Sequence, residues 1–425
     1  MNKNFFFLIF VFFFNFLSFS QDKKYAKEII KKLSSEEFLG RGYSHNADKI
    51  ASNFIKEELE KIPLQKFDTS FFQNFDISIN NFSGKMTVEI DDKKLIPAVD
   101  YLIDGISKSC KGEFEIVLLN KLILQNQKLF DEFKKKKFLE KVILIDTVGV
   151  SNKETLQILE TLIYFNTFKT AAYIEVYDKD LIFSPSMKEG NSTIIKVKRE
   201  NISLHSKKIF IDVENQFLQK YETRNIAAFV QGKTDKFLVF SAHYDHIGEM
   251  GENVYFPGAN DNASGVAMIL DLAKYFANLK EKPNYSIAFL FFSAEEIGLI
   301  GSKYFCENPL FEMRNIECLI NLDMVGSGEK GITIVNGKVF DEEFNKFTEI
   351  NGNKNYLKKI KARDKAANSD HYFFYKNNVK SFFIYTLGNY KEYHNIYDKS
   401  EELPLNEYEN LFKLLIDYSN WELKK

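Results

Sequence analysis

Residues 237–248 read FLVFSAHYDHIG, and in this segment an apolar run is followed closely by the polar side chain of His243. The pattern recurs at residues 287–292, where an all-apolar run precedes Glu295 and Glu296. Such short apolar runs are typical of strands that are buried on both faces. In open α/β sheets, side chains just beyond the carboxyl ends of the strands converge on one crevice. The sequence therefore predicts a polar site at the edge of a buried sheet.

The rest of the C-terminal half alternates strand-like runs with stretches of helical apolar spacing. This alternation is typical of a sheet that is covered by helices on both faces. We therefore predict an α/β fold with a mixed, mainly parallel sheet sandwiched by helices. The expected strands are 237–240, 287–292, 316–322, 332–335 and 381–385, and the expected helices are 24–33, 46–61, 263–279, 342–350 and 406–421.

Residues 84–200 have a different pattern, with short β-rich runs, one helical stretch and no metal-ligand spacing. We interpret this segment as an inserted β-rich domain. Residues 21–83 and 201–425 then form the main domain around it. A chain of 425 residues exceeds the usual size of one domain, and its 45% hydrophobic residues can fill a large core.

The N-terminal residues 1–20 resemble a signal peptide. Lys3 precedes an apolar run, and small residues stand at Ser18 and Ser20. A membrane anchor is the alternative, but Asn15 interrupts the run, which is shorter than the roughly 20 residues of a spanning helix. We expect a secreted or periplasmic protein with no membrane span after the signal is removed.

The charge balance excludes some classes of partner. The chain has 57 basic and 59 acidic residues, a formal net charge of -2, which argues against a broad surface for nucleic acid or anionic lipid. Three cysteines are too few for a disulfide scaffold. A bridge between Cys306 and Cys318 stays open as an alternative.

The segment SAHYDHIG places Asp245 two residues after His243. The second ring nitrogen of a metal-binding histidine is usually held by a carboxylate or a carbonyl group, and Asp245 could hold His243 in this way. A lone His-x-Asp pair also arises by chance. We interpret His246 as a surface or cleft-wall histidine rather than a ligand.

Asp261 lies in the glycine- and asparagine-rich loop PGANDNASGVA, residues 257–267, before a predicted helix. A residue of this type often caps a helix N-terminus, which is the simpler interpretation. A carboxylate can also bridge two cations, which a neutral histidine cannot do. Asp261 is therefore the candidate for a bridging ligand if a metal pair is present.

Glu295 and Glu296 are adjacent carboxylates directly after a buried strand. Burial and mutual repulsion would raise their pKa values, unless one carboxylate binds metal and the other accepts protons. We predict that Glu295 is a general base and that Glu296 is a metal ligand. The alternative is a helix N-terminus, whose dipole favours glutamate.

Asp323 and His394 each follow a further apolar run. A carboxylate at the end of a buried strand needs a polar partner. In the segment YHNIYD, Asp398 is close enough to orient His394, and Tyr393 could donate a hydrogen bond. Considered singly, either Asp323 or His394 could be a loop residue with a structural hydrogen bond.

The combined order of these motifs resembles the di-zinc aminopeptidase family, of the secreted bacterial leucyl aminopeptidase type, whose relatives include glutaminyl cyclases and the catalytically silent transferrin receptor. The resemblance covers about residues 225–398 with motifs, and the helices before Gly84 more loosely. It implies that residues 21–83 and 201–425 form a zinc peptidase domain. By position and strand pattern, the inserted segment resembles a protease-associated domain.

The resemblance implies a set of ligands for two Zn²⁺ ions per chain. His243 and Asp323 would hold one ion, Glu296 and His394 the other, and Asp261 would bridge the two. It also implies a cis peptide bond after Asp261. Carboxylates in this number nearly neutralise two dications, which lowers the cost of enclosing them. Cobalt or manganese would suit the same donor atoms.

The implied function is hydrolysis of the amino-terminal peptide bond of a peptide or protein substrate. Two metals would activate a water with Glu295 as general base, Tyr393 would stabilise the oxyanion, and Asp245 would orient His243. One alternative is a glutaminyl cyclase-like aminoacyltransferase, which the loop GANDNASG disfavours. The other is a catalytically silent binding or receptor protein on the same fold, which the complete ligand set argues against.

Overall fold

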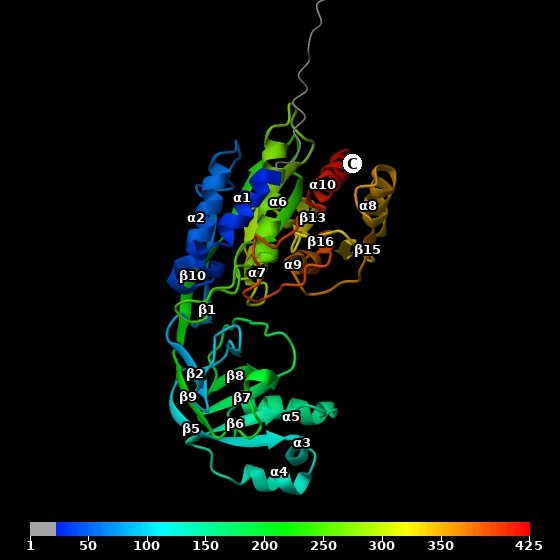
Figure 1. The fold of residues 1–425 in the computed structure, drawn as a ribbon. Helices are drawn as coiled ribbons and strands as arrows, with labels where there is room; N and C mark the ends of the chain where they lie inside the picture. Colours follow the sequence, from blue (N-terminus) through cyan, green and yellow to red (C-terminus); the bar gives the residue numbers. More distant parts are fainter. Residues whose placement is uncertain (1–22) are drawn as a thin grey trace, which may run out of the picture.

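The computed structural model describes residues 23–425, which form two eight-stranded sheets (Figure 1). The predicted signal peptide, residues 1–20, lies outside the described residues. Among residues 23–425, none of the helices combines the length and the apolar character that crossing a bilayer requires.

The first sheet contains both parallel and antiparallel neighbours. Its strands, in spatial order, are β1 (Phe72–Asn81), β10 (Gln216–Val230), β12 (Ser286–Phe292), β11 (Phe237–His243), β13 (Ile316–Leu322), β16 (Ser381–Leu387), β14 (Gly331–Val335) and β15 (Ile360–Ala362). The four central strands, β12, β11, β13 and β16, are mutually parallel. β1 pairs antiparallel with β10, β10 with β12 and β14 with β16, whereas β14 and β15 are parallel. The predicted α/β class with a mixed, mainly parallel sheet is confirmed.

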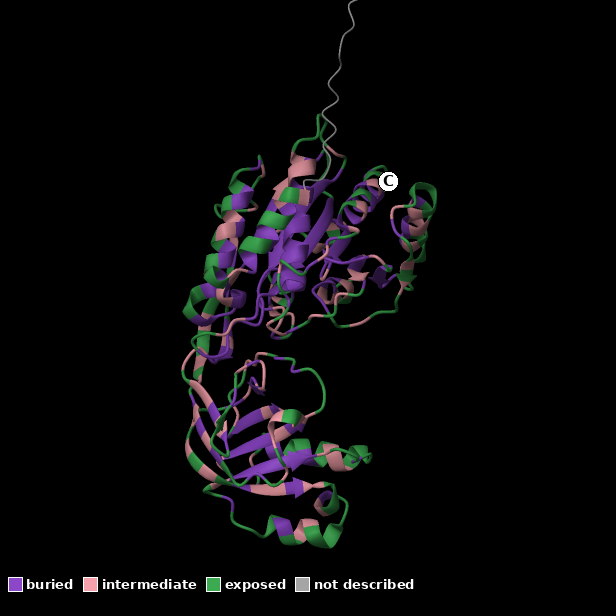
Figure 2. Ribbon diagram, in the orientation of Figure 1, coloured by how far each residue is buried: buried purple, intermediate pink, exposed green. Residues whose placement is uncertain are grey.

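Helices cover both faces of this sheet. They are α1 (Lys23–Leu33), α2 (Ala47–Glu60), α6 (Ser264–Ala277), α8 (Asp341–Lys354) and α10 (Tyr408–Glu422) on one face, and α7 (Ile300–Glu307) and α9 (His371–Lys376) on the other. Alternate side chains of β11 serve the two cores: Leu238 and Phe240 pack with the first group and Val239 with the second. Figure 2 shows the consequence, with buried strands between helices whose outer surfaces are exposed.

The apolar runs predicted the central strands well, because those strands are buried on both faces. The antiparallel pair of β1 and β10 was not predicted. β1 alternates buried and exposed residues, and β10 carries charged residues such as Lys220, Glu222 and Arg224. The possible disulfide bridge is absent, since both Cys306 and Cys318 are free, and Cys318 is buried in β13.

The second sheet is formed by the segment between β1 and β10. Its strands, in spatial order, are β3 (Lys93–Lys94), β2 (Met86–Ile90), β9 (Lys208–Val213), β5 (Cys110–Asn120), β6 (Lys141–Asp146), β7 (Ala172–Tyr177), β8 (Thr193–Lys198) and β4 (Tyr101–Ile103). Its helices are α3 (Lys121–Leu124), α4 (Gln127–Lys134) and α5 (Lys153–Tyr164). β5 to β8 are parallel. The sheet includes β9, so it extends beyond residue 200, where the sequence pattern placed the boundary of the insert.

Candidate metal centre

The predicted ligands gather at the carboxyl ends of the four parallel central strands. His243 is the last residue of β11, and Asp323 directly follows β13. Glu295 and Glu296 follow β12, and His394 lies in the loop after β16. Because these strands are parallel neighbours, their carboxyl ends meet at one edge of the sheet, as expected for this class of fold.

The carboxylate of Asp261 lies between two histidines. Its Oδ1 is 3.2 Å from Nε2 of His243, and its Oδ2 is 3.2 Å from Nε2 of His394. His243 Nε2 is also 3.4 Å from Oδ1 of Asp323, and His394 Nε2 is 2.9 Å from Oε2 of Glu296. The structure therefore brings all five predicted ligands together, with Asp261 between the two pairs.

The donor atoms of this cluster fit a pair of zinc ions. His243 and Asp261 are 1% and 3% exposed, so both are buried. Within residues 23–425, Nε2 of His243 and Nε2 of His394 are buried and make no hydrogen bond. An imidazole nitrogen that is buried without a hydrogen bond, beside carboxylate oxygens, is suited to a cation that both groups can coordinate. Imidazole nitrogen and carboxylate oxygen are usual ligand atoms of zinc.

The loop that carries Asp261 is fixed from both sides. Oδ2 of Asp398 accepts a hydrogen bond from the backbone N–H of Asp261 at 3.0 Å, and Arg41 donates to the carbonyl oxygen of Asp261 at 3.0 Å. The peptide bond between Asp261 and Asn262 is cis, as the resemblance implied. Asp398 therefore positions the Asp261 loop, and the prediction that it orients His394 is wrong.

Arg41 is buried and was not singled out from the sequence. It lies between α1 and α2 and donates five hydrogen bonds to carbonyl oxygens, four of which belong to segments around the metal centre. These four acceptors are Tyr244, Pro257, Gly258 and Asp261. Gly258 has φ of +59°, and a Cβ atom there would lie 2.6 Å from a guanidinium nitrogen of Arg41. The guanidinium thus fixes the path of the backbone on either side of Asp261.

Asp245 holds His243 by its backbone rather than by its carboxylate. Nδ1 of His243 is 3.1 Å from the carbonyl oxygen of Asp245 and 3.8 Å from the nearest carboxylate oxygen. The carboxylate instead accepts hydrogen bonds from the hydroxyl of Tyr43 at 2.8 Å and from the N–H of Glu295 at 3.2 Å. Asp245 therefore orients the loop of the predicted base as well as the imidazole of His243.

His246 is not a surface histidine, contrary to our interpretation of the sequence. It is fully buried, and its Nδ1 lies 2.7 Å from Oε1 of Glu296. Its donor atoms group with those of Asp261, Glu296 and His394, all within 4.8 Å of one another. The spacing in the sequence gave little sign of this, because His246 lies in a loop rather than at a strand end.

A hydroxyl group supports the other pair of ligands. Ser369 donates to Oδ2 of Asp323 at 2.7 Å and accepts a hydrogen bond from the side chain of Asn321 at 2.7 Å. This leaves Oδ1 of Asp323 facing His243. Hydrogen bonds of this kind orient metal ligands and raise metal affinity.

The protonation equilibria at the centre are dominated by burial and by charge pairing. Burial raises the pKa of Glu295 well above its ordinary value, although His243 opposes the effect. Burial also acts to raise the pKa of Glu296, but the charge of His394 and the hydrogen bonds from His246 and His394 together lower that pKa to about 2. The pKa values of the two adjacent glutamates are therefore shifted in opposite directions, which suits a different role for each.

Tyr393 lies at the rim of the centre. Its ring is 39% exposed and stacks on the imidazole of His394, with 3.8 Å between the ring centroids. Burial of the hydroxyl and the nearby carboxylate of Asp261 raise its pKa. The hydroxyl therefore stays protonated at neutral pH and is able to donate a hydrogen bond.

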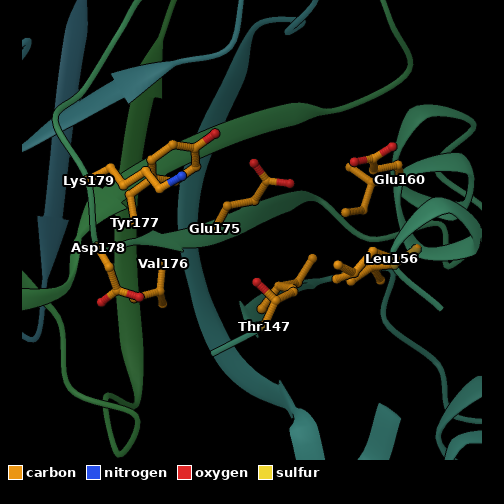
Figure 3. A pocket seen from close by; sticks show the side chains of 11 residues that line it. Thr147, Leu156, Glu160, Glu175, Val176, Tyr177, Asp178 and Lys179 are labelled. Carbon is orange, nitrogen blue, oxygen red and sulfur yellow. The ribbon is translucent and has the colours of Figure 1, made fainter. Parts of the chain in front are cut away.

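A separate hollow of about 400 Å³ lies in the second sheet, at the carboxyl ends of β6 and β7 (Figure 3). Glu160 of α5 and Glu175 of β7 lie on its walls with Thr147 and Lys179. None of the predicted site residues lines it. Within residues 23–425, the groups of side chains able to hold a metal lie at the first sheet instead.

Comparison with known proteins finds relatives of the part of the chain that carries this centre. Residues 225–419 match the family model described as peptidase family M28. An aminopeptidase from Pseudomonas aeruginosa (strain UCBPP-PA14) is 35% identical over 121 residues, which are 28% of this chain and 21% of the relative. Leucine aminopeptidase 1 from Pyrenophora teres f. teres (strain 0-1) is 35% identical over 116 residues, which are 25% of this chain and 28% of the relative.

Among solved structures, a zinc aminopeptidase from Bacillus subtilis matches with a TM-score of 0.69 at 19% identity and covers 93% of both chains, which shows a shared fold. The matches to the two curated relatives span less than a third of each relative's length. All five predicted ligands lie within the segment that the family model matches. Residues 225–419, which are less than half of this chain, are therefore similar to peptidase family M28.

Proposed function

We propose that the protein is a secreted zinc aminopeptidase that hydrolyses the amino-terminal peptide bond of peptides. The observation that carries the proposal is the position of Asp261, whose two carboxylate oxygens face His243 and His394 separately. A buried carboxylate shared between two imidazoles is the arrangement that a two-metal hydrolase needs. The relatives' names support the reaction class.

The chain offers two overlapping sets of zinc ligands. His243 and Asp323 would hold one ion, Glu296 and His394 the other, and Asp261 would contact both. When bound, paired zinc ions lower the pKa of a water molecule and polarise a carbonyl group. Their positive charge also compensates the buried carboxylates, which are costly to enclose otherwise.

Glu295 is positioned to move the proton. Its backbone N–H is held by Asp245, and its carboxylate lies with His243 and Asp323 in one group of donor atoms. A carboxyl group whose pKa is raised by burial is a stronger base than an exposed one. We infer that the carboxylate of Glu295 accepts a proton from the attacking water and delivers it to the departing amine nitrogen.

The decisive test of the function is paired measurement of zinc content and cleavage. Purified protein with zinc restored should bind two zinc ions per chain and release nitroaniline from aminoacyl-nitroanilides. Substrates with an acetylated amino group should be cleaved far more slowly. Cyclisation of amino-terminal glutamine with one zinc ion per chain would instead indicate the cyclase alternative, and a folded protein that binds no zinc would contradict both.

The hydroxyl of Tyr393 should matter for the rate and not for the metals. Tyr393→Phe removes one donor from the rim of the centre, so kcat should fall by roughly 10²- to 10³-fold. KM and zinc content should change little. Tyr397→Phe is the matched control, because Tyr397 is similarly exposed, at 46%, and belongs to the same loop, whereas the ring that stacks on His394 is that of Tyr393. Equal kcat values for the two variants would remove Tyr393 from the mechanism.

A further inference from the structure

A loop of the second sheet reaches the metal centre of the first. The segment between β7 and β8 extends toward the first sheet in Figure 1. Its Phe183 contacts both the backbone and the side chain of His394. The N–H of Phe183 donates to the carbonyl oxygen of His394 at 3.1 Å. Nδ1 of His394 is 2.9 Å from the carbonyl oxygen of Phe183. The two residues are therefore joined by a reciprocal pair of hydrogen bonds.

We propose that residues 181–187, hereafter the strap, orient a ligand of the metal centre and thereby determine the zinc affinity of one of its two positions. This inference rests on the proposed role of His394 as a zinc ligand. A carbonyl oxygen has no proton to give, so Nδ1 of His394 must carry the proton in the bond to Phe183. The lone pair then lies on Nε2, the atom that faces Asp261 and Glu296.

The two proposed ligand histidines differ in the part of the chain that supplies the hydrogen-bond acceptor for Nδ1. Nδ1 of His243 is held by the carbonyl oxygen of Asp245, two residues along the same loop. Nδ1 of His394 is held by Phe183, which is 211 residues away and belongs to the other sheet. A displacement of the strap should therefore weaken the position that contains His394 and leave the position that contains His243 unaffected.

The strap is held firmly enough to orient a side chain. Phe183 is 3% exposed, and its ring stacks on Phe256 with 5.3 Å between centroids. The carbonyl oxygen of Ser186 accepts a hydrogen bond from the N–H of Asn80 at 2.9 Å. A Cβ atom on Gly105 would lie 2.3 Å from the carbonyl oxygen of Ser184, so the backbones are in close contact there. Contacts on both sheets thus fix the position of the strap.

The test uses the whole protein and measures zinc binding directly. Phe183→Ala removes the ring that holds the strap, and chelator competition should then show that one of the two zinc ions binds about 10- to 100-fold more weakly. The other zinc ion should bind as in the wild type. Phe183→Leu keeps an apolar side chain in the same place and should restore most of the affinity.

Phe133→Ala is the matched control. Phe133 is buried in a separate core of the same sheet, with Phe138 and Phe168, so its loss loosens the second sheet away from the strap. Gly105→Ala is an independent variant, since the added methyl group displaces Ser184 without removing any contact of the ring. Gly105→Ala therefore tests the inference even if Phe183→Ala does not fold.

Selective loss of one zinc ion in Phe183→Ala and Gly105→Ala, with Phe133→Ala unchanged, supports the inference. Wild-type affinity for both ions in the two strap variants overturns it. An equal loss in Phe133→Ala also overturns it, because the effect would then come from general destabilisation of the second sheet. Failure of the wild type itself to bind zinc is a different result, which contradicts the proposed function.

Discussion

Glu295→Gln should lower kcat by about 10²- to 10⁴-fold while zinc content stays at two ions per chain. Glutamine has almost the same shape as glutamate, but its amide cannot accept the proton of the attacking water. The adjacent Glu296, whose carboxylate faces His394, is unchanged in this variant. Single-turnover hydrolysis of an aminoacyl-nitroanilide, with metal analysis of the same sample, measures both quantities.

Glu249→Gln is the control for this substitution. Glu249 is a buried glutamate that pairs with His45 and lies outside the groups of possible metal ligands. It tests whether loss of any buried carboxylate lowers the rate. Loss of zinc from Glu295→Gln would show that Glu295 is a ligand, and an unchanged kcat would show that it is not the base.

Arg41→Met should destabilise the protein by about 3–5 kcal/mol, because it leaves buried carbonyl oxygens without donors. The guanidinium of Arg41 donates five hydrogen bonds, and a side chain of similar length without charge replaces none of them. Urea unfolding of the zinc-free protein measures the change in the free energy of unfolding. Zinc affinity should fall as well, since Arg41 positions the loop of Asp261.

Arg224→Met provides the comparison. Arg224 is only partly buried and donates to Ser52, Asn53 and the carbonyl oxygen of Lys49 in α2, none of which carries a proposed ligand. Its replacement should cost less than half as much free energy of unfolding and leave zinc affinity unchanged. If the two variants lose equal stability and keep their zinc, Arg41 has no special connection with the metal centre.

Four of the five proposed ligands could be predicted because each comes after an apolar strand, and the carboxyl ends of parallel strands meet. Asp261 lies in the loop before α6, and its place between the two metals was implied by the family resemblance. The signals that failed are those that depend on the folded path of the chain. Arg41 lies more than 200 residues before four of the five carbonyl groups that it holds. His246 lies in a loop, where hydrophobic periodicity does not indicate which way a side chain points. A backbone acceptor such as Phe183 has no signature at all, because every residue carries a carbonyl group.

The sequence also did not predict which oxygen atoms orient the two histidine rings of the metal centre. The segment HYDH suggested that the carboxylate of Asp245 would hold His243, and YHNIYD suggested the same of Asp398 for His394. In each case a carbonyl oxygen takes that place. The two aspartates hold backbone N–H groups instead, at Glu295 and at Asp261. Which of two nearby oxygen atoms faces a ring depends on loop conformation, and sequence spacing does not determine it.

The second sheet leaves and rejoins the first through paired neighbours, since Asn81 at the end of β1 lies opposite Gln216 at the start of β10. Its two points of attachment are therefore about 5 Å apart, which a tight turn could span. The second sheet is therefore inserted between two neighbouring points of the first, and a short hairpin could replace it without moving β1 or β10. Its removal would nevertheless take away the carbonyl group that holds Nδ1 of His394, so a shortened chain of this kind is expected to lose the support of one proposed metal position.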